Sequence, residues 1–378
     1  MPTPVLPCAT VVSSGVKPIL LPPRANMMKL QNGTKFTHLL QSLTGRKCLT
    51  LALLAGLTLG LSGCNSSGDS ADGGGGSSSG GKQFITVGTA TQGGVYSLVG
   101  NAIANTVEAE KGELNWSVTA QGSKGTQENI RKLSAGEIEF GMSNAAIAYF
   151  ASRGEGSWDK KQEIRSVATL APNICVFVTT EKANIKTMAD LKGKRVVLGP
   201  PGAGFEAFLG PILKAHDLTY DDVEVKNAGF LAASELLADG GADAAFMGGV
   251  PPNGVVKGLC QSQDIVFVKM NDNLYDTLKD LPFYAPATVK AGVYSDLTED
   301  LGTVNCGNMQ LISHANVDED VVYNFTKLLF ENAQKIADQH PAGNAIKPGN
   351  VVKQVGVPFH PGAIKYYKEK GFWPEDAE

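Results

Sequence analysis

Short apolar runs alternate with longer amphipathic segments from about residue 84 onward, and loops of small residues separate them. Five times, an apolar run of four or five residues leads through such a loop into a segment with helical spacing. We expect the strands at 84–88, 116–120, 138–142, 195–198 and 244–247. The helices after them are expected at 95–110, around Ile130 and Leu133, at 145–152, at 205–215 and up to about Leu259. This alternation predicts an α/β fold with mainly parallel sheets and helices on both faces.

Other segments depart from this alternation. Apolar runs at 164–170 and 174–180 are expected to form adjacent strands. Further elements are expected as a short helix at 188–192, a strand at 304–313, a long amphipathic helix at 317–338 and a last helix at 363–370. The short helix would have Thr187 at its N-cap and Asp190 at the third helical position, which is a capping-box arrangement.

Two irregular stretches, near 178–180 and 284–290, are expected to carry the chain between two α/β lobes. The first lobe would comprise residues 83–179 and 286–378, and the second residues 180–285. Two crossings predict a hinge with a ligand cleft between the lobes.

The N-terminal region has the layout of a secretory signal peptide, with Arg46 and Lys47 before an apolar run from Leu49 to Leu61. The run is too short for a transmembrane helix, which needs about 20 apolar residues. We interpret residues 1–63 as the signal peptide, with a start at Met1, Met27 or Met28. The small residues before Cys64 resemble the lipobox of bacterial lipoproteins, which implies lipidation of Cys64 and anchoring in the periplasm. The alternative is an ordinary signal peptide followed by a chance cysteine.

The predicted mature chain begins with a Gly- and Ser-rich tether, residues 64–82. The first 63 residues hold six basic residues and no acidic one, so 27 Lys and Arg remain against 37 Asp and Glu. This balance argues against nucleic acid as a partner, because nucleic-acid binding needs a basic surface. It leaves an anionic ligand open, since backbone N–H groups at helix N-termini bind anions.

Three cysteines remain after Cys64, and none has metal-ligand spacing. Cys175 lies in an apolar run and reads as a core residue. A disulfide between Cys260 and Cys306 is left open. The chain also has no Walker A, HExxH or EF-hand sequence, and its histidines are scattered. We therefore predict no cofactor, no metal and no enzymatic activity.

The main functional signal is a set of loops of small residues, each between a strand and a helix. Ligands of open α/β sheets bind beyond the carboxyl ends of the strands. The candidate ligand-binding residues in these loops are Gln92, Gly93, Gly94, Tyr96, Ser123, Ser143, Asn144, Gly202, Ala203, Gly204, Phe205 and Gly248. We expect loop N–H groups to hold carboxylates, and Tyr96, Ser123 and Asn144 to give selectivity.

Several segments together resemble the TAXI family, the substrate-binding receptors of tripartite ATP-independent periplasmic (TRAP) transporters. They are ITVGTATQGGVYSLVGNAIANTV, the QGS-x-G-T loop, ADLKGKRVVLGPPGAG and VPFHPGAIKYYKEKGF, and the resemblance covers residues 83–378. It implies a type II periplasmic-binding-protein fold and delivery of a small organic anion or amino acid to a membrane permease. Glutamate-like ligands and dicarboxylates are typical of such receptors.

Two departures from the family pattern bear on the cargo. The family often has Gly-Ser-Gly-Thr where this chain has Gly202-Ala203-Gly204-Phe205, and Gln-Ser-Asp where it has Met142-Ser143-Asn144. Together they favour a different or more apolar cargo than glutamate. Three alternatives to a transport receptor stay open: a periplasmic sensor that presents ligand to a receptor kinase, a hydrolase or isomerase, and a structural surface lipoprotein.

Overall fold

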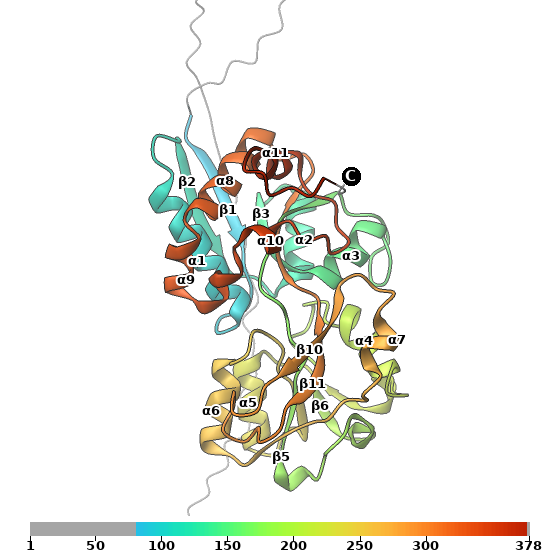
Figure 1. Ribbon diagram of the computed structural model, residues 1–378. Coiled ribbons are helices and arrows are strands. Elements are labelled where there is room, and N and C mark those ends of the chain that lie inside the picture. The colour runs from blue at the N-terminus through green and yellow to red at the C-terminus, as the bar shows by residue number, and fades with distance from the viewer. Residues whose placement is uncertain (1–80, 376–378) are drawn as a thin grey trace, which may run out of the picture. The chain divides into compact units, whose positions relative to one another are not determined.

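The computed structural model describes residues 81–375 (Figure 1). The predicted signal peptide, Cys64 and nearly all of the predicted tether lie outside these residues. Within 81–375, no helix combines the length and the apolar character that a bilayer crossing requires.

The first sheet has the strand order β2-β1-β3-β12-β4. Its strands are β1 (Gln83–Gly88), β2 (Trp116–Gln121), β3 (Phe140–Asn144), β4 (Ile164–Thr169) and β12 (Met309–His314). β1 pairs in parallel with β2 and β3, whereas β12 is antiparallel to β3 and β4. The sheet is therefore mixed, because one strand from the C-terminal part of the chain inserts between strands from the N-terminal part.

Helices cover this sheet because their apolar faces pack against its buried residues. The helices of this lobe are α1 (Val95–Glu110), α2 (Thr126–Ala135), α3 (Ala145–Arg153), α8 (Glu319–Glu331), α9 (Ala333–Gln339), α10 (Pro348–Val351) and α11 (Pro361–Glu369). Ile103 of α1 and Phe325 of α8 belong to one core with Ile85 and Phe140. The Phe140 and Phe325 rings stack with centroids 4.0 Å apart, which fixes α8 against β3.

The second sheet has the order β7-β6-β8-β5-β9. Its strands are β5 (Phe177–Thr180), β6 (Arg195–Val197), β7 (Glu224–Lys226), β8 (Ala244–Phe246) and β9 (Ile265–Phe267), and its helices are α4 (Glu206–Lys214), α5 (Phe230–Ala238), α6 (Gly254–Ser262) and α7 (Leu274–Leu278). β5 is antiparallel to both of its neighbours. A two-stranded antiparallel ribbon, β10 (Tyr284–Val289) with β11 (Leu301–Cys306), belongs to this lobe. Val289 and Leu301 of the ribbon share a core with Val178 and Ala245.

Both sheets follow the same topology, in which the fourth position belongs to the strand that enters from the other lobe. β12 holds that position in the first sheet and β5 holds it in the second. This arrangement is the type II periplasmic-binding-protein fold, and it agrees with the expected two-lobed α/β architecture. The expectation of mainly parallel sheets was wrong for the two strands that cross between the lobes.

The chain passes from one sheet to the other at positions that differ from the predicted lobe limits at 179/180 and 285/286. The chain leaves β4 at Thr169 and joins the second sheet at Phe177, and it returns between Cys306 and Met309. The two crossing segments are hydrogen bonded to each other: the Cys306 N–H donates to Asn173 O at 2.8 Å, and the Leu170 N–H to Met309 O at 2.7 Å. The hinge is therefore a pair of joined segments at 170–176 and 306–309.

Two predicted elements are interrupted. The strand expected at 304–313 is two strands, because Gly307 has a φ of +106° and breaks the extended backbone between the lobes. The helix expected at 317–338 ends at Glu331 and restarts at Ala333, with Asn332 between the two parts. The short element at Met188–Leu191 is a 3-10 helix with the predicted capping box of Thr187 and Asp190. Further 3-10 helices lie at Glu181–Ala183, Tyr220–Asp222 and Pro341–Ala345.

Candidate ligand-binding cavity

A cavity of about 60 Å³ lies between the two lobes at the carboxyl ends of their parallel strands. The first lobe contributes the loops after β1 and β2 and the end of β3, and the second contributes the loops after β6 and β8 and the start of α5. Asn173 of the hinge completes the wall. The loops converge because the carboxyl ends of parallel strands meet at one edge of a sheet.

The predicted site residues divide by position. Those that line the cavity are Gly94, Tyr96, Asn144, Phe205 and Gly248. The others, which lie near the cavity without lining it, are Gln92, Gly93, Ser123, Ser143, Gly202, Ala203 and Gly204. Ligand contact by any of these residues stays a prediction.

Tyr96 lies in the first turn of α1, and its hydroxyl is fully buried. Burial raises the pKa of this phenol, so the hydroxyl stays protonated and remains a hydrogen-bond donor. Asn144 lies beside the hydroxyl, yet no hydrogen bond of acceptable geometry satisfies it within residues 81–375. An unsatisfied buried hydroxyl is costly, and a ligand group in the cavity would satisfy it.

Asn144 is the N-cap of α3, and both polar atoms of its side chain form hydrogen bonds. Its Oδ1 accepts hydrogen bonds from the N–H groups of Ala146 (2.9 Å) and Ile147 (3.4 Å). Its Nδ2 donates to the carbonyl oxygens of Cys306 (3.3 Å) and Gly307 (3.0 Å) in the hinge. The side chain therefore couples the cavity wall to the returning segment of the hinge.

The two serine hydroxyls bond to the backbone. Ser123 Oγ donates to Thr89 O at 3.2 Å and accepts the Gly125 N–H at 3.0 Å. Ser143 Oγ donates to Asn144 O at 3.2 Å and is buried in β3. Both side chains shape the loops that carry the lining residues.

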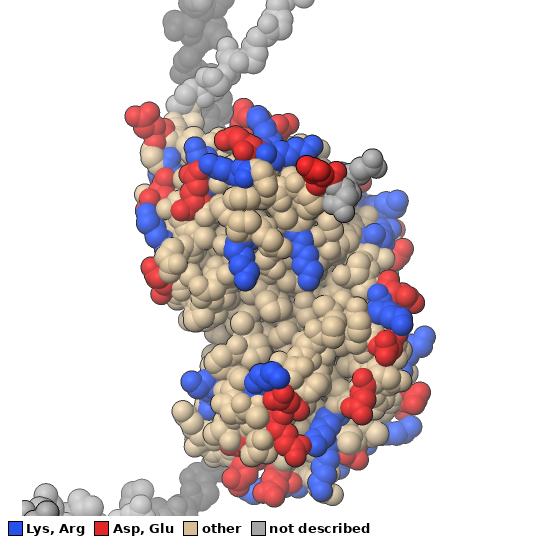
Figure 2. Space-filling view, viewed as in Figure 1, with Lys and Arg blue, Asp and Glu red and all other residues tan. Residues whose placement is uncertain are grey.

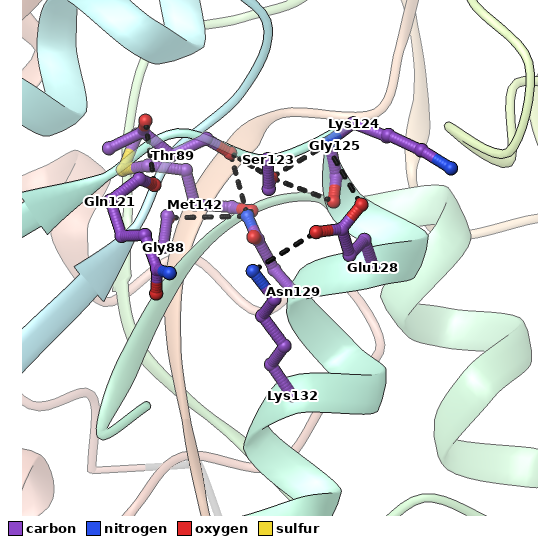
Figure 3. A network of polar contacts seen from close by, with 10 residues as sticks. All are labelled: Gly88, Thr89, Gln121, Ser123, Lys124, Gly125, Glu128, Asn129, Lys132 and Met142. Atoms are coloured by element: carbon purple, nitrogen blue, oxygen red, sulfur yellow. Dashed lines mark hydrogen bonds and ion pairs between the residues drawn. The ribbon is translucent and has the colours of Figure 1, made fainter. Parts of the chain in front are cut away.

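Lys124 lines the cavity and was not among the predicted residues. Its backbone N–H donates to Glu128 Oε2 at 3.2 Å, and the Glu128 carboxylate pairs with Lys132 at 3.0 Å. Figure 3 shows the Lys124 side chain extending away from this ion pair. In the same network, Asn129 Nδ2 donates to the carbonyls of Gly88, Thr89 and Met142, which joins α2 to the ends of β1 and β3.

Four phenylalanines of the second lobe form the apolar wall of the cavity: Phe205, Phe208, Phe230 and Phe246. The Phe246 ring lies 5.6 Å from Phe208, 5.7 Å from Phe205 and 6.3 Å from Phe230, centroid to centroid. Gly199 has a φ of +110°, and a Cβ there would lie 2.3 Å from the Phe205 ring. Only Phe205 was predicted; the other three look like ordinary core residues of their elements when read from the sequence.

The loop with Gly202, Ala203 and Gly204 packs against the first lobe. A Cβ on Gly204 would lie 3.3 Å from Gln127 Cβ and from Ile147 Cγ2, and Ala203 is buried. At another point, a Cβ on Gly93 would lie 2.8 Å from a methyl group of Leu231 in α5. The lobes thus touch on either side of the cavity, so this conformation is closed.

Within residues 81–375, contacts inside the fold account for the cysteines and histidines. All three cysteines are free thiols. Cys306 adjoins Asn173 and Cys175, whereas Cys260 adjoins Ser295 and Asp296, so the disulfide left open between Cys260 and Cys306 is not formed. His340 and His360 cap helices through their side chains. In the described part of the chain, no group of three or more His, Cys, Asp or Glu residues is arranged so that it could hold a metal ion.

The strand order and the cavity between the lobes define a two-lobed α/β protein with the fold of periplasmic binding proteins. The model of the NMT1-like family matches residues 87–371, and the chain belongs to that family. This match does not name the TAXI family, which stays a prediction.

Similar solved structures show low identity. The periplasmic aliphatic sulphonate binding protein SsuA from Escherichia coli is 16% identical, with 77% of this chain and 84% of that chain covered and a TM-score of 0.45. A binding protein component of an ABC phosphonate transporter from Pseudomonas aeruginosa is 10% identical, with 71% and 81% covered and a TM-score of 0.47. A structure described for glutathione import in Streptococcus mutans is 12% identical, with 70% and 95% covered and a TM-score of 0.46.

Proposed function

We propose that this protein is an extracytoplasmic solute-binding receptor, anchored by lipid on Cys64, that delivers a small organic anion or amino acid to a TRAP-type secondary transporter. The observation that carries the proposal is the cavity between the lobes, which takes its walls from both lobes and from the hinge. A ligand held there contacts both lobes at once. It therefore favours the closed state by the difference between its affinities for the closed and open states.

The cavity volume supports a binding cycle with lobe movement. A volume of about 60 Å³ holds a few water molecules, whereas ligand pockets for larger compounds measure about 300–1,000 Å³. An organic acid therefore needs the lobes to lie further apart than they do here, both to enter and to be held, and closure around it presents a changed surface to the permease. The resemblance of residues 83–378 to the TAXI family supports the TRAP-type permease as the partner.

The first test is a thermal-shift screen. The protein is unfolded and refolded to remove any ligand carried through purification, then screened against amino acids, dicarboxylates and other organic acids. A receptor gives a melting temperature that rises with ligand concentration as RT ln(1 + [L]/Kd) predicts. Absence of any shift from a folded protein would contradict the proposal.

The alternative of a periplasmic sensor that presents ligand to a receptor kinase uses the same cavity. Reconstitution separates the two functions: vesicles with the cognate permease accumulate ligand only if the protein is a transport receptor. A hydrolase would instead turn its ligand over, with a pH–rate profile.

A further inference from the structure

The cavity has one charged side chain in its lining, counted over residues 81–375, and that side chain is Lys124. Within residues 81–375 its ammonium group forms no ion pair; the nearby Glu128 carboxylate pairs with Lys132, although the charge of Lys124 also helps to lower the pKa of Glu128. A Cβ on Gly202 would lie 3.9 Å from Lys124 Cδ, so the side chain reaches the loop of the second lobe. Lys124 is exposed, so its positive charge lies at a solvent-facing part of the cavity lining where the two lobes meet.

The backbone beside Lys124 adds to this positive end. Gly125 is the N-cap of α2 and lines the cavity, and it has no side chain to accept hydrogen bonds from the N–H groups of the first turn. A helix N-terminus carries a partial positive charge and binds anions. Lys124 and the N-terminus of α2 together offer a binding site for one carboxylate of a ligand. The unsatisfied hydroxyl of Tyr96 supplies a further donor in the same cavity.

The opposite wall is apolar, since Phe205, Phe208, Phe230 and Phe246 all belong to the second lobe. A charged ligand group placed against these rings would lose its hydration without gaining a partner. Among the described residues, the lining has no Asp or Glu to pair with a ligand ammonium and no second cation to pair with a second carboxylate. On the outer face that Figure 2 shows, charged side chains gather mainly toward the two ends, and the band between them is mostly uncharged.

We infer that the ligand is an organic monoanion with one carboxylate and a short branched or aromatic apolar body, without an amino group. The carboxylate binds at Lys124 and the N-terminus of α2, and the apolar body packs against the four phenylalanines. This inference rests on the proposed receptor function and narrows its ligand class away from glutamate-like compounds and dicarboxylates.

Two matched series of compounds test the inference. The protein is the full chain in detergent, freed beforehand of any ligand carried through purification. Isovalerate, valine and isopropylmalonate share one carbon skeleton; valine adds an ammonium group and isopropylmalonate adds a second carboxylate. Phenylacetate, phenylglycine and phenylmalonate form the aromatic series. Isothermal titration should give Kd values for isovalerate or phenylacetate at least tenfold lower than for the other members of the same series.

Three variants test whether the compounds bind in the cavity. Lys124→Met keeps the length of the side chain and removes its charge, and it should weaken monoanion binding at least tenfold. Lys160→Met, at an exposed lysine outside the cavity lining, should leave it unchanged. Phe230→Gln, at a half-buried ring, should weaken the apolar monoanions at least fivefold while the circular dichroism spectrum stays native.

The outcomes separate the inference from the function on which it rests. Tighter binding of valine, glutamate, succinate or isopropylmalonate than of the monoanions, with loss in Lys124→Met, would overturn the inference and keep the receptor function. Equal monoanion binding by wild type and Lys124→Met would also overturn it. No saturable binding by any compound of the screen, from a folded protein, would overturn both.

Discussion

Asn144 Nδ2 donates a hydrogen bond of 3.0 Å to the carbonyl oxygen of Gly307, a residue 163 positions later in the chain. Asn144 ends β3 in the first lobe, and Gly307 lies where the chain returns from the second lobe. The same side chain lines the cavity and caps α3. A single amide thus connects the ligand cavity, a helix and the hinge.

Asn144→Asp should lower the free energy of unfolding by about 1–3 kcal/mol, as expected when buried hydrogen bonds are lost. The carboxylate keeps the cap on α3 but places a negative charge against the carbonyls of Cys306 and Gly307. Urea unfolding measures the change. Asp318→Asn is the control, because Asp318 caps α8 on the surface and the exchange should cost less than about 0.5 kcal/mol. Equal costs in the two variants would contradict the role of Asn144 in the hinge.

Gly307→Ala should destabilise the protein more than Gly371→Ala. Both glycines have positive φ, which costs an L-residue about 1–2 kcal/mol. A Cβ on Gly307 would also lie 2.5 Å from Asn144 Oδ1, whereas a Cβ on Gly371 meets nothing within 4 Å. Thermal unfolding of both variants measures the difference, which combines this clash with the less favourable backbone of Gly307, whose φ is +106° against +70° at Gly371. A smaller loss for Gly307→Ala would show that the hinge relaxes around the added methyl group.

A disulfide across the cleft should hold the lobes together. A Cβ on Gly229 would lie 3.9 Å from Thr91 Oγ1, and the backbone of Gly229, with φ −71°, accepts any residue. No other atom of Thr91 lies within 4 Å of that position, so in the variant with Thr91→Cys and Gly229→Cys the two Cβ atoms are more than 4 Å apart, and the disulfide, which needs about 3.5–4.5 Å, forms at the upper end of this range or after a small shift of the two loops. Small-angle X-ray scattering without ligand should give a larger radius of gyration for the reduced form than for the oxidised form. Identical radii would mean that the ligand-free protein is already closed.

Stability should fall as the pH drops below about 6.5, the ordinary pKa of histidine. Burial lowers the pKa of His216, whose Nε2 accepts the Asn271 N–H at 3.0 Å and whose Nδ1 bonds Ile212 O at 2.7 Å. Because the unfolded state takes up the proton at higher pH, the stabilisation is complete above about 6.5 and is lost as the pH falls through the folded-state pKa. Burial shifts the pKa values of His340 and His360 in the same direction.

Urea unfolding between pH 8 and pH 5 measures this dependence. His216→Gln should show a shallower decline than wild type, and the difference between the two proteins at pH 8 reports the lost packing and hydrogen bonds of the neutral side chain. An unchanged slope in the variant would assign the decline to other groups.

Cys64→Ser should move the protein from the membrane fraction to the soluble extract. Two acyl chains contribute about 0.8 kcal/mol for each buried CH2 group, which holds a lipoprotein firmly at the membrane. Cys48→Ser, within the predicted signal peptide, is the matched control and should keep the membrane association. Detergent phase partitioning measures the membrane association of both variants. The same partitioning for wild type and Cys64→Ser would favour an ordinary signal peptide with a chance cysteine.

Local patterns predicted the elements well where the signal is confined to one segment. The helix expected at 95–110 is α1 at Val95–Glu110, and the capping box at Thr187 and Asp190 is present. The site was predicted less completely. Lys124, Phe208 and Phe246 gave no local signal, because a lysine in a loop and phenylalanines in apolar segments have many ordinary explanations. Their common position appears only when the two sheets are assembled.

The sequence by itself determined the order of strands, loops and helices, since apolar periodicity, caps and small-residue loops act over a few neighbouring residues. It also placed small-residue loops at the strand ends where the cavity forms. The tertiary structure decided the strand pairing, including the antiparallel insertion of β12 and β5. It also decided that Gly307 breaks a continuous apolar run and that the four phenylalanines line the same cavity as one lysine. These outcomes depend on contacts between residues far apart in the chain, whose energies come from packing and hydrogen bonds formed only in the folded state.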